Sequence, residues 1–155
     1  MNTSASGNWS SGATWTGGAI PDKDNVATVD LNGKTVTLDA GTGALTDNNA
    51  AATNVTAGQF TAIGPGGINL DTSVDTLTFT SGGLVDINQL DTVALANAST
   101  ANNLVLVAGT SLTDGTDGHV TVTNNASFAA PTITLGDDGA ANEVNFGTLT
   151  FNGTT

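Results

Sequence analysis

Residues of the types that perform catalysis are scarce in this chain. It contains one histidine, His119, and neither cysteine nor arginine. His119 stands between Gly118 and Val120, where we expect a strand to begin, so the sequence predicts a solvent-facing corner residue rather than a catalytic base. A Gly-x-Ser-x-Gly nucleophile motif is absent. The lack of cysteine also removes thiol nucleophiles, disulfides and thiolate metal sites.

Paired carboxylates are the second kind of catalytic group to consider, because glycoside hydrolysis needs one protonated and one ionised carboxyl group. Asp86 with Asp91, or Asp71 with Asp75, would approach each other across neighbouring rungs of a stacked sheet, as would many acidic pairs here. Enzymes that act on acidic polysaccharides usually neutralise the substrate carboxylate with Arg or Lys, and this chain has only two lysines. We therefore predict a non-enzymatic protein, with a polysaccharide-active enzyme as the less favoured alternative.

Two acidic turns contain oxygen ligands of the kind that calcium prefers. One turn holds Asp114 and Asp117, and the other holds Asp137 and Asp138. Neither turn matches an EF-hand loop or the calcium-binding nonapeptide repeat. Because Asp and Gly are also favoured in turns for their backbone geometry, the sequence predicts no cofactor, with calcium at these four residues as the alternative.

Composition restricts the partners of the protein. Its 155 residues favour a single domain, and fourteen acidic residues against two basic ones give a net charge of −12. Such a charge repels nucleic acid and anionic lipid headgroups. No apolar run has the length of a membrane helix, and the first residues lack the basic and apolar regions of a secretory signal. We expect no nucleic-acid partner and no membrane insertion.

Short apolar-alternating segments recur about every eight to eleven residues in the middle of the chain. Side chains two apart on a strand face the same way, so each segment has one apolar face and one Thr/Asn/Asp face. The apolar pairs are Ile68 and Leu70, Leu77 and Phe79, Val85 and Ile87, Val93 and Leu95, and Leu104 and Leu106. No segment would fold alone, whereas stacked copies bury one continuous interior. This pattern predicts an all-β solenoid.

The alternation continues to the end of the chain, at residues 119–122, 127–129, 132–135, 143–146 and 148–151. With about 20 to 25 residues per coil, the chain would make six or seven coils. At about 4.8 Å per rung, the body would be about 30 Å long. Asn32-Gly33 predicts either a hairpin between strands 26–31 and 34–39 or a coil corner. Residues 44–57 predict a loose loop or a short helix.

The first 25 residues differ from the rest, being rich in Ser, Gly and Thr and containing both tryptophans, Trp9 and Trp15. A solenoid needs a cover over its terminal rung. We therefore predict that residues 1–25 form an N-terminal cap on coils formed by residues 26–155, all within one domain. An aromatic platform for sugar stacking is the alternative use of the two tryptophans.

Two stretches resemble known bacterial surface proteins. Residues 68–114 (INLDTSVDTLTFTSGGLVDINQL and onward) and 119–153, which end in NFGTLTFNG, resemble the repeats of filamentous-haemagglutinin-like giant adhesins. The opening GNWSSGATWTGGAIPDKDNVATVDLNGKTVTL resembles a Trp-Trp-Pro module at the start of β-solenoid blocks in such proteins. The resemblance covers nearly all of the chain. It implies a right-handed parallel β-helix, an extracellular or cell-surface location and an adhesive or structural role.

We therefore predict a structural or adhesive β-solenoid module, with a host or neighbouring-cell surface or glycan as the unidentified receptor. The last strands have no evident cap after them, so an assembly edge is expected at Val144, Phe146, Leu149 and Phe151, where copies would join end to end into a fibre. The alternatives are carbohydrate binding and ice binding. Thr-x-Thr triplets favour the latter, although their spacing is uneven, and the phenylalanines mostly occupy core positions rather than an exposed face.

Overall fold

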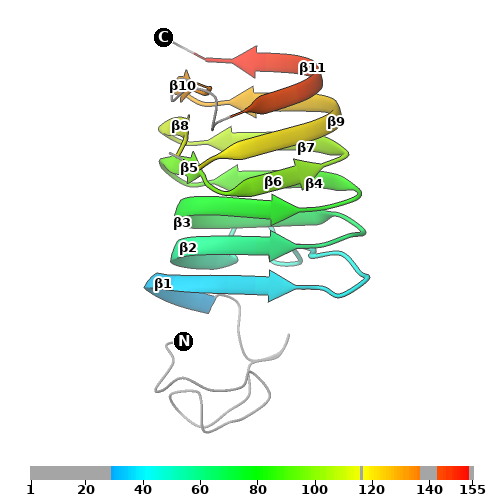
Figure 1. Cartoon of the computed structure of the whole chain (residues 1–155). Helices are drawn as coiled ribbons and strands as arrows, with labels where there is room; N and C mark the ends of the chain where they lie inside the picture. The colour runs from blue at the N-terminus through cyan, green and yellow to red at the C-terminus, as the bar shows by residue number, and fades with distance from the viewer. Residues whose placement is uncertain (1–28, 116, 137–142, 154–155) are drawn as a thin grey trace, which may run out of the picture.

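A computed structural model describes residues 29–115, 117–136 and 143–153, which form an all-β solenoid of about six turns (Figure 1). Its strands are β1 (Val29–Asp39), β2 (Val55–Ile63), β3 (Ile68–Thr80), β4 (Leu84–Gln89), β5 (Val93–Leu95), β6 (Ala98–Ala101), β7 (Asn103–Ala108), β8 (Ser111–Asp114), β9 (His119–Ala129), β10 (Thr132–Thr134) and β11 (Val144–Asn152). Every pairing among them is parallel. The predicted β-solenoid is confirmed. The predicted cap, with Trp9 and Trp15, lies outside the described residues.

Three columns of stacked strands form the walls of the solenoid. Column 1 contains the start of β3, then β4, β7 and the second halves of β9 and β11. Column 2 contains β1, β2, the middle of β3, then β5, β8 and β10. Column 3 contains the end of β3, then β6 and the first halves of β9 and β11. β3 pairs with β4, β5 and β6 along its length, so this one strand covers the part of the coil that three separate strands cover in the next coil (Figure 1).

Column 1 shows how the predicted alternation builds the core. Residues of one strand that are two apart face inward together, and the register stacks them on the inward residues of the next coil. One ladder is Leu70, Ile87, Leu106, Phe128 and Phe151. The members Ile87, Leu106 and Phe128 are fully buried. Full burial of such a side chain contributes about 1.5–3 kcal/mol, so the column is a continuous source of stability.

The coils differ in length, and the loops absorb the difference. Ile68 pairs with Val85, 17 residues later, whereas Val120 pairs with Val144, 24 residues later. The first coil includes a connection between β1 and β2 that is poor in large apolar residues. Of the segment 44–57, residues 44–54 contain no helix and form a loop, whereas the last three residues begin β2.

A bonded turn organises the connection between β1 and β2. Asp47 Oδ1 accepts hydrogen bonds from Asn49 N at 2.7 Å and from Asn54 Nδ2 at 3.0 Å. These bonds, the Asn49 bond first, hold the pKa of Asp47 below its usual value. The hydrogen bonds thus favour the ionised form of this carboxyl group.

The dipeptide Asn32-Gly33 does not make a hairpin. β1 continues through it in one direction, and both of its halves pair in parallel with β2. The register shifts between Leu31 and Thr35, and Gly33 has a φ of 68°. Glycine adopts this left-handed conformation without a Cβ clash, so the dipeptide forms a β-bulge. The hairpin alternative was wrong because a sequence signal for positive φ does not distinguish a bulge from a reversal.

Candidate functional site

The structure places His119 where the sequence predicts it. It is exposed, it is the first residue of β9, and its backbone N–H donates to Asn97 O at 2.9 Å. The imidazole is thus at a corner between columns 2 and 3. The prediction of a solvent-facing corner residue is confirmed.

Neither predicted carboxylate pair meets across adjacent coils, because both members of each pair belong to the same coil. The pairs are Asp71 with Asp75 in β3, and Asp86 in β4 with Asp91 just after it. Beside Asp86, the register places Asn69 on one neighbouring strand and Val105 on the other. Beside Asp71 it places Asn88. The register therefore places amide and apolar side chains, and no second carboxylate, beside Asp71 and Asp86 on these neighbouring strands.

The first acidic turn begins where β8 ends and bonds to Gly136 of the next coil. Asp114 ends β8, and Gly136 N, just before the second turn, donates to its Oδ2 at 2.7 Å. Asp117 is exposed at the first turn, while Asp137 and Asp138 lie outside the described residues. Within residues 29–115, 117–136 and 143–153, no three acidic or histidine side chains are grouped to hold a metal ion. Calcium at these turns stays a prediction.

Asp114 is more buried than a turn residue needs to be. It is 7% exposed, and the register stacks it on the fully buried Leu95. Its Oδ1 has no hydrogen-bond partner in the part of the chain that the structure describes. Burying a polar atom without a partner costs about 1–3 kcal/mol. The burial of Asp114 was not predicted, since an aspartate beside glycine is typical of an exposed turn.

The last coil leaves apolar side chains exposed at the C-terminal end of the solenoid. Leu149 is 42% and Phe151 is 57% exposed, whereas Ala126 and Phe128, beneath them in the same ladders, are fully buried. Phe151 stacks on Phe128 with ring centroids 6.3 Å apart. Val144 and Phe146, the other two residues predicted at this edge, are half-buried against the core.

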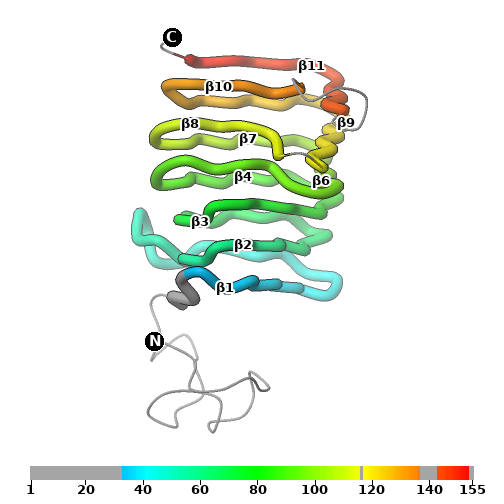
Figure 2. Tube along the Cα trace, turned by 60° about the vertical axis from the view of Figure 1, so that its left-hand side comes forward, coloured from blue at the N-terminus to red at the C-terminus, as the bar shows by residue number. Residues whose placement is uncertain are grey.

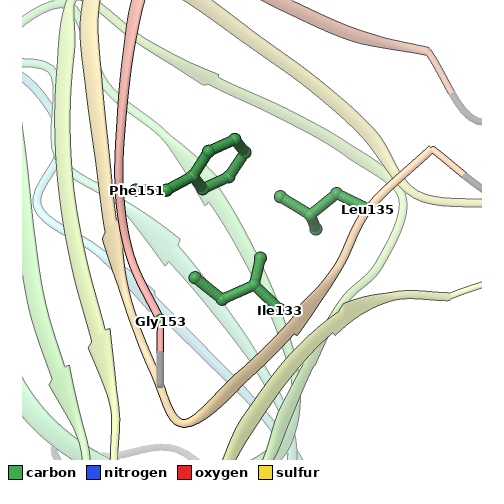
Figure 3. A pocket seen from close by; sticks show the side chains of 4 residues that line it. All are labelled: Ile133, Leu135, Phe151 and Gly153. Atoms are coloured by element: carbon green, nitrogen blue, oxygen red, sulfur yellow. The ribbon is translucent and has the colours of Figure 1, made fainter. Parts of the chain in front are cut away.

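A hollow of about 280 Å³ opens on this last coil and is lined by Ile133, Leu135, Phe151 and Gly153 (Figure 3). Three apolar side chains in it point toward one another from β10, the residue after β10, and β11 (Figure 3). In earlier coils the corresponding inward positions are closed by the next rung. The inward-facing side chains of the last rung therefore form an apolar surface. We call this surface the C-terminal rung (Ile133, Leu135, Leu149 and Phe151).

A second hollow, of about 330 Å³, lies on the outer face of column 2 and was not predicted as a site. Five successive coils line it, with side chains that include Thr35, Gln59, Thr76, Asn97 and Asp117. We call it the column 2 groove. The Thr-x-Thr triplets are visible in the sequence, but their spacing is uneven. Which of them stack depends on the lengths of the coils, which the sequence pattern does not determine.

These features define the class of the protein. Parallel strands stacked in register around a continuous apolar interior make the chain a β-solenoid repeat protein of about six turns. No family model, curated protein or solved structure matches the chain in the comparisons. Among the described residues, no helix has the length and apolar character needed to span a membrane.

Proposed function

We propose that the chain is a non-enzymatic structural module of a bacterial cell-surface or extracellular protein, in which it serves as a stiff rod or adhesive element. The proposal is supported by the resemblance of its repeats to those of filamentous-haemagglutinin-like adhesins. It is also supported by the outer surface, where small uncharged side chains predominate. The continuous inward ladder from Leu70 to Phe151 is the observation that carries the proposal, because such a core resists bending along its whole length.

The C-terminal rung is the assembly edge of this module in our proposal, and its occupant is the first coil of a second copy. The outer edge of a terminal strand offers unpaired backbone groups to another strand. In column 2, Val36 of the first coil begins a line of inward positions that passes through Phe60, Leu77 and Leu95 to Asp114. Leu135 follows β10 on the next coil. Head-to-tail stacking would place the inward side chains of the first coil, Val36 among them, over the C-terminal rung of another copy once the predicted cap of residues 1–25 has moved off that coil. Such a heterologous contact does not close on itself and produces a fibre.

Lysine at the C-terminal rung is expected to stop fibre growth. Leu149→Lys combined with Phe151→Lys places two charges where the next coil must bury apolar surface, at positions that are already 42% and 57% exposed. The parent chain should sediment faster and form longer particles in negative-stain images as its concentration rises. The double variant should remain a monomer with a melting temperature close to that of the parent.

The matched control is Leu84→Lys combined with Leu90→Lys, which changes two leucines at the ends of β4, 46% and 68% exposed on the side of the solenoid. This control should assemble like the parent. Monodisperse single particles of the parent chain at all concentrations would refute end-to-end assembly. Equal loss of assembly in both double variants would indicate lateral association instead.

A further inference from the structure

We propose that the column 2 groove binds a neutral, unbranched polysaccharide chain lying parallel to the solenoid axis. The proposal concerns a side face and is independent of end-to-end assembly. The groove crosses five successive coils, from Thr35 in β1 to Asp117 after β8. Figure 2 turns forward the side of the solenoid that carries β8 and β10. With rungs about 4.8 Å apart, the groove is long and narrow, as a linear chain requires.

The register aligns the polar side chains of the groove in two rows. Thr35, Gln59 and Thr76 follow one another on successive coils and form the first row. Thr61 and Thr78 are neighbours in the second row. All of them point away from the core, because Phe60 and Leu77, which lie between them in sequence, are buried. A ligand along the axis therefore meets the same kind of group at each rung.

Some of these groups are held in place by bonds to one another. Thr35 Oγ1 donates to Gln59 Oε1 at 3.1 Å, and Thr78 Oγ1 donates to the Ala96 carbonyl at 2.7 Å. Asn97 Nδ2 donates to Thr78 Oγ1 at 3.2 Å. Asn97 reaches this position from a backbone with a φ of 56°, which is uncommon for a residue other than glycine. The wall of the groove is thus preorganised before any ligand arrives.

Donors and acceptors remain for a ligand. The hydroxyls of Thr61 and Thr76 and the Asp117 carboxylate have no hydrogen bond within the described part of the chain, and the Gln59 amide nitrogen has donors to spare. Hydroxyls both donate and accept, the amide nitrogen donates and the carboxylate accepts. Sugar hydroxyls need this mixture, because each of them both donates and accepts.

The charge of the groove selects a neutral ligand. Among the described residues that line it, Asp117 is the only charged one and none is basic. In a protein with a net charge of −12, this carboxylate repels uronic acids and sulfated sugars. The ring of Phe60 is 1% exposed and cannot stack on a sugar face. Binding therefore rests on hydrogen bonds repeated along the chain, so longer oligosaccharides should bind more tightly than short ones.

Ice binding, in which a flat array of threonine hydroxyls orders water, is the competing function for such a face. The groove suits ice binding less well than it suits a polysaccharide. Gln59 and Ala96 replace threonine in the array, and Asn97 and Asp117 line the hollow beside it. A surface with these irregularities does not repeat one hydroxyl pattern on every rung. A polysaccharide, whose hydroxyl groups project at several positions along the chain, adapts to this surface better than the rigid lattice of ice does.

An NMR titration of the isotopically labelled full chain tests the proposal. The probes are linear hexasaccharides of β-1,4-glucose and β-1,4-N-acetylglucosamine, with a hexamer of galacturonic acid as the anionic comparison. Neutral probes are expected to shift the amide signals of the groove and to leave those of column 3 unchanged. The combined variant Thr61→Val and Thr76→Val should weaken binding about fivefold for each hydrogen bond lost, or about 25-fold for both.

The matched control is Thr100→Val combined with Thr121→Val. These threonines are also exposed and also stack on adjacent coils, but they lie in column 3 outside the groove. The control should bind like the parent. The proposal is overturned if neither neutral probe shifts the groove signals, if the anionic hexamer binds more tightly, or if the groove variant instead loses ice-crystal shaping that the parent shows.

Discussion

Replacing Leu106 with aspartate is expected to abolish the stable fold of the solenoid. Leu106 is fully buried in β7, and the register stacks it between Ile87 and Phe128. Loss of the leucine side chain costs about 2–5 kcal/mol, and burying an unpaired carboxylate adds several kcal/mol more. The sum is comparable with the whole stability of a typical domain, about 5–15 kcal/mol. Circular dichroism should show no cooperative thermal transition for Leu106→Asp.

The matched control for this variant is Val107→Asp, one residue away on the same strand. Val107 is 38% exposed on the outer face, beside Asn88 and Ala129, so its carboxylate reaches water. Its melting temperature should lie within a few degrees of that of the parent. If Leu106→Asp melted like the parent, the inward face assigned to β7 would be wrong.

Replacing Gln89 with leucine is expected to give the second largest loss of stability. Gln89 is 1% exposed, and its Oε1 accepts from Thr72 Oγ1 at 2.7 Å and from Val74 N at 3.2 Å. Its Nε2 lies within hydrogen-bonding distance of three acceptors, Val74 O, Asp91 Oδ1 and Thr92 O. The Gln89 side chain therefore provides hydrogen-bond partners for backbone groups at the bend between columns 1 and 2.

Leucine has a similar size but leaves those backbone groups without partners, at about 1–3 kcal/mol for each one that water cannot reach. Urea unfolding of Gln89→Leu should give a free energy of unfolding lower by about 3 kcal/mol or more. Asn88→Leu, at the exposed neighbouring position, removes an amide without uncovering buried groups and should change the free energy by less than about 1 kcal/mol. An unchanged midpoint for Gln89→Leu would show that the amide bonds do not stabilise the bend.

The inward ladders could be predicted from sequence because alternation is a local property. Leu70, Ile87 and Leu106 each stand at the end of an apolar-polar-apolar triplet, and any stacked arrangement buries them. Leu149 and Phe151 continue the same pattern on the last described coil, where they are exposed. These features could be predicted without knowing the register between neighbouring strands.

The groove and the buried polar groups needed the register, which local pattern does not supply. Adjacent coils differ by several residues, and a shift of one residue turns a strand's side chains to the other face. Whether Thr76 lies beside Gln59, or Asp114 beside Leu95, therefore depends on loop lengths summed over a whole coil. Gln89 was missed for a related reason, because a buried amide at an inward position breaks the apolar pattern on which the core was predicted.

Disulfide formation between engineered cysteines on neighbouring coils tests the parallel stacking most directly, because the natural chain contains no cysteine. Asn88 and Val107 are exposed and stand side by side in the register of β4 and β7. Their Cα atoms should be about 4.8 Å apart, within the range that a disulfide spans. Asn88→Cys with Val105→Cys, offset by two residues and about 8 Å apart, is the control pair.

Mild oxidation of the monomeric double-cysteine chain, followed by intact-mass and free-thiol measurement, should give an intramolecular disulfide in the Asn88/Val107 pair and little in the control pair. Preferential cross-linking of the control pair, or of neither pair, would contradict parallel coils stacked in this register.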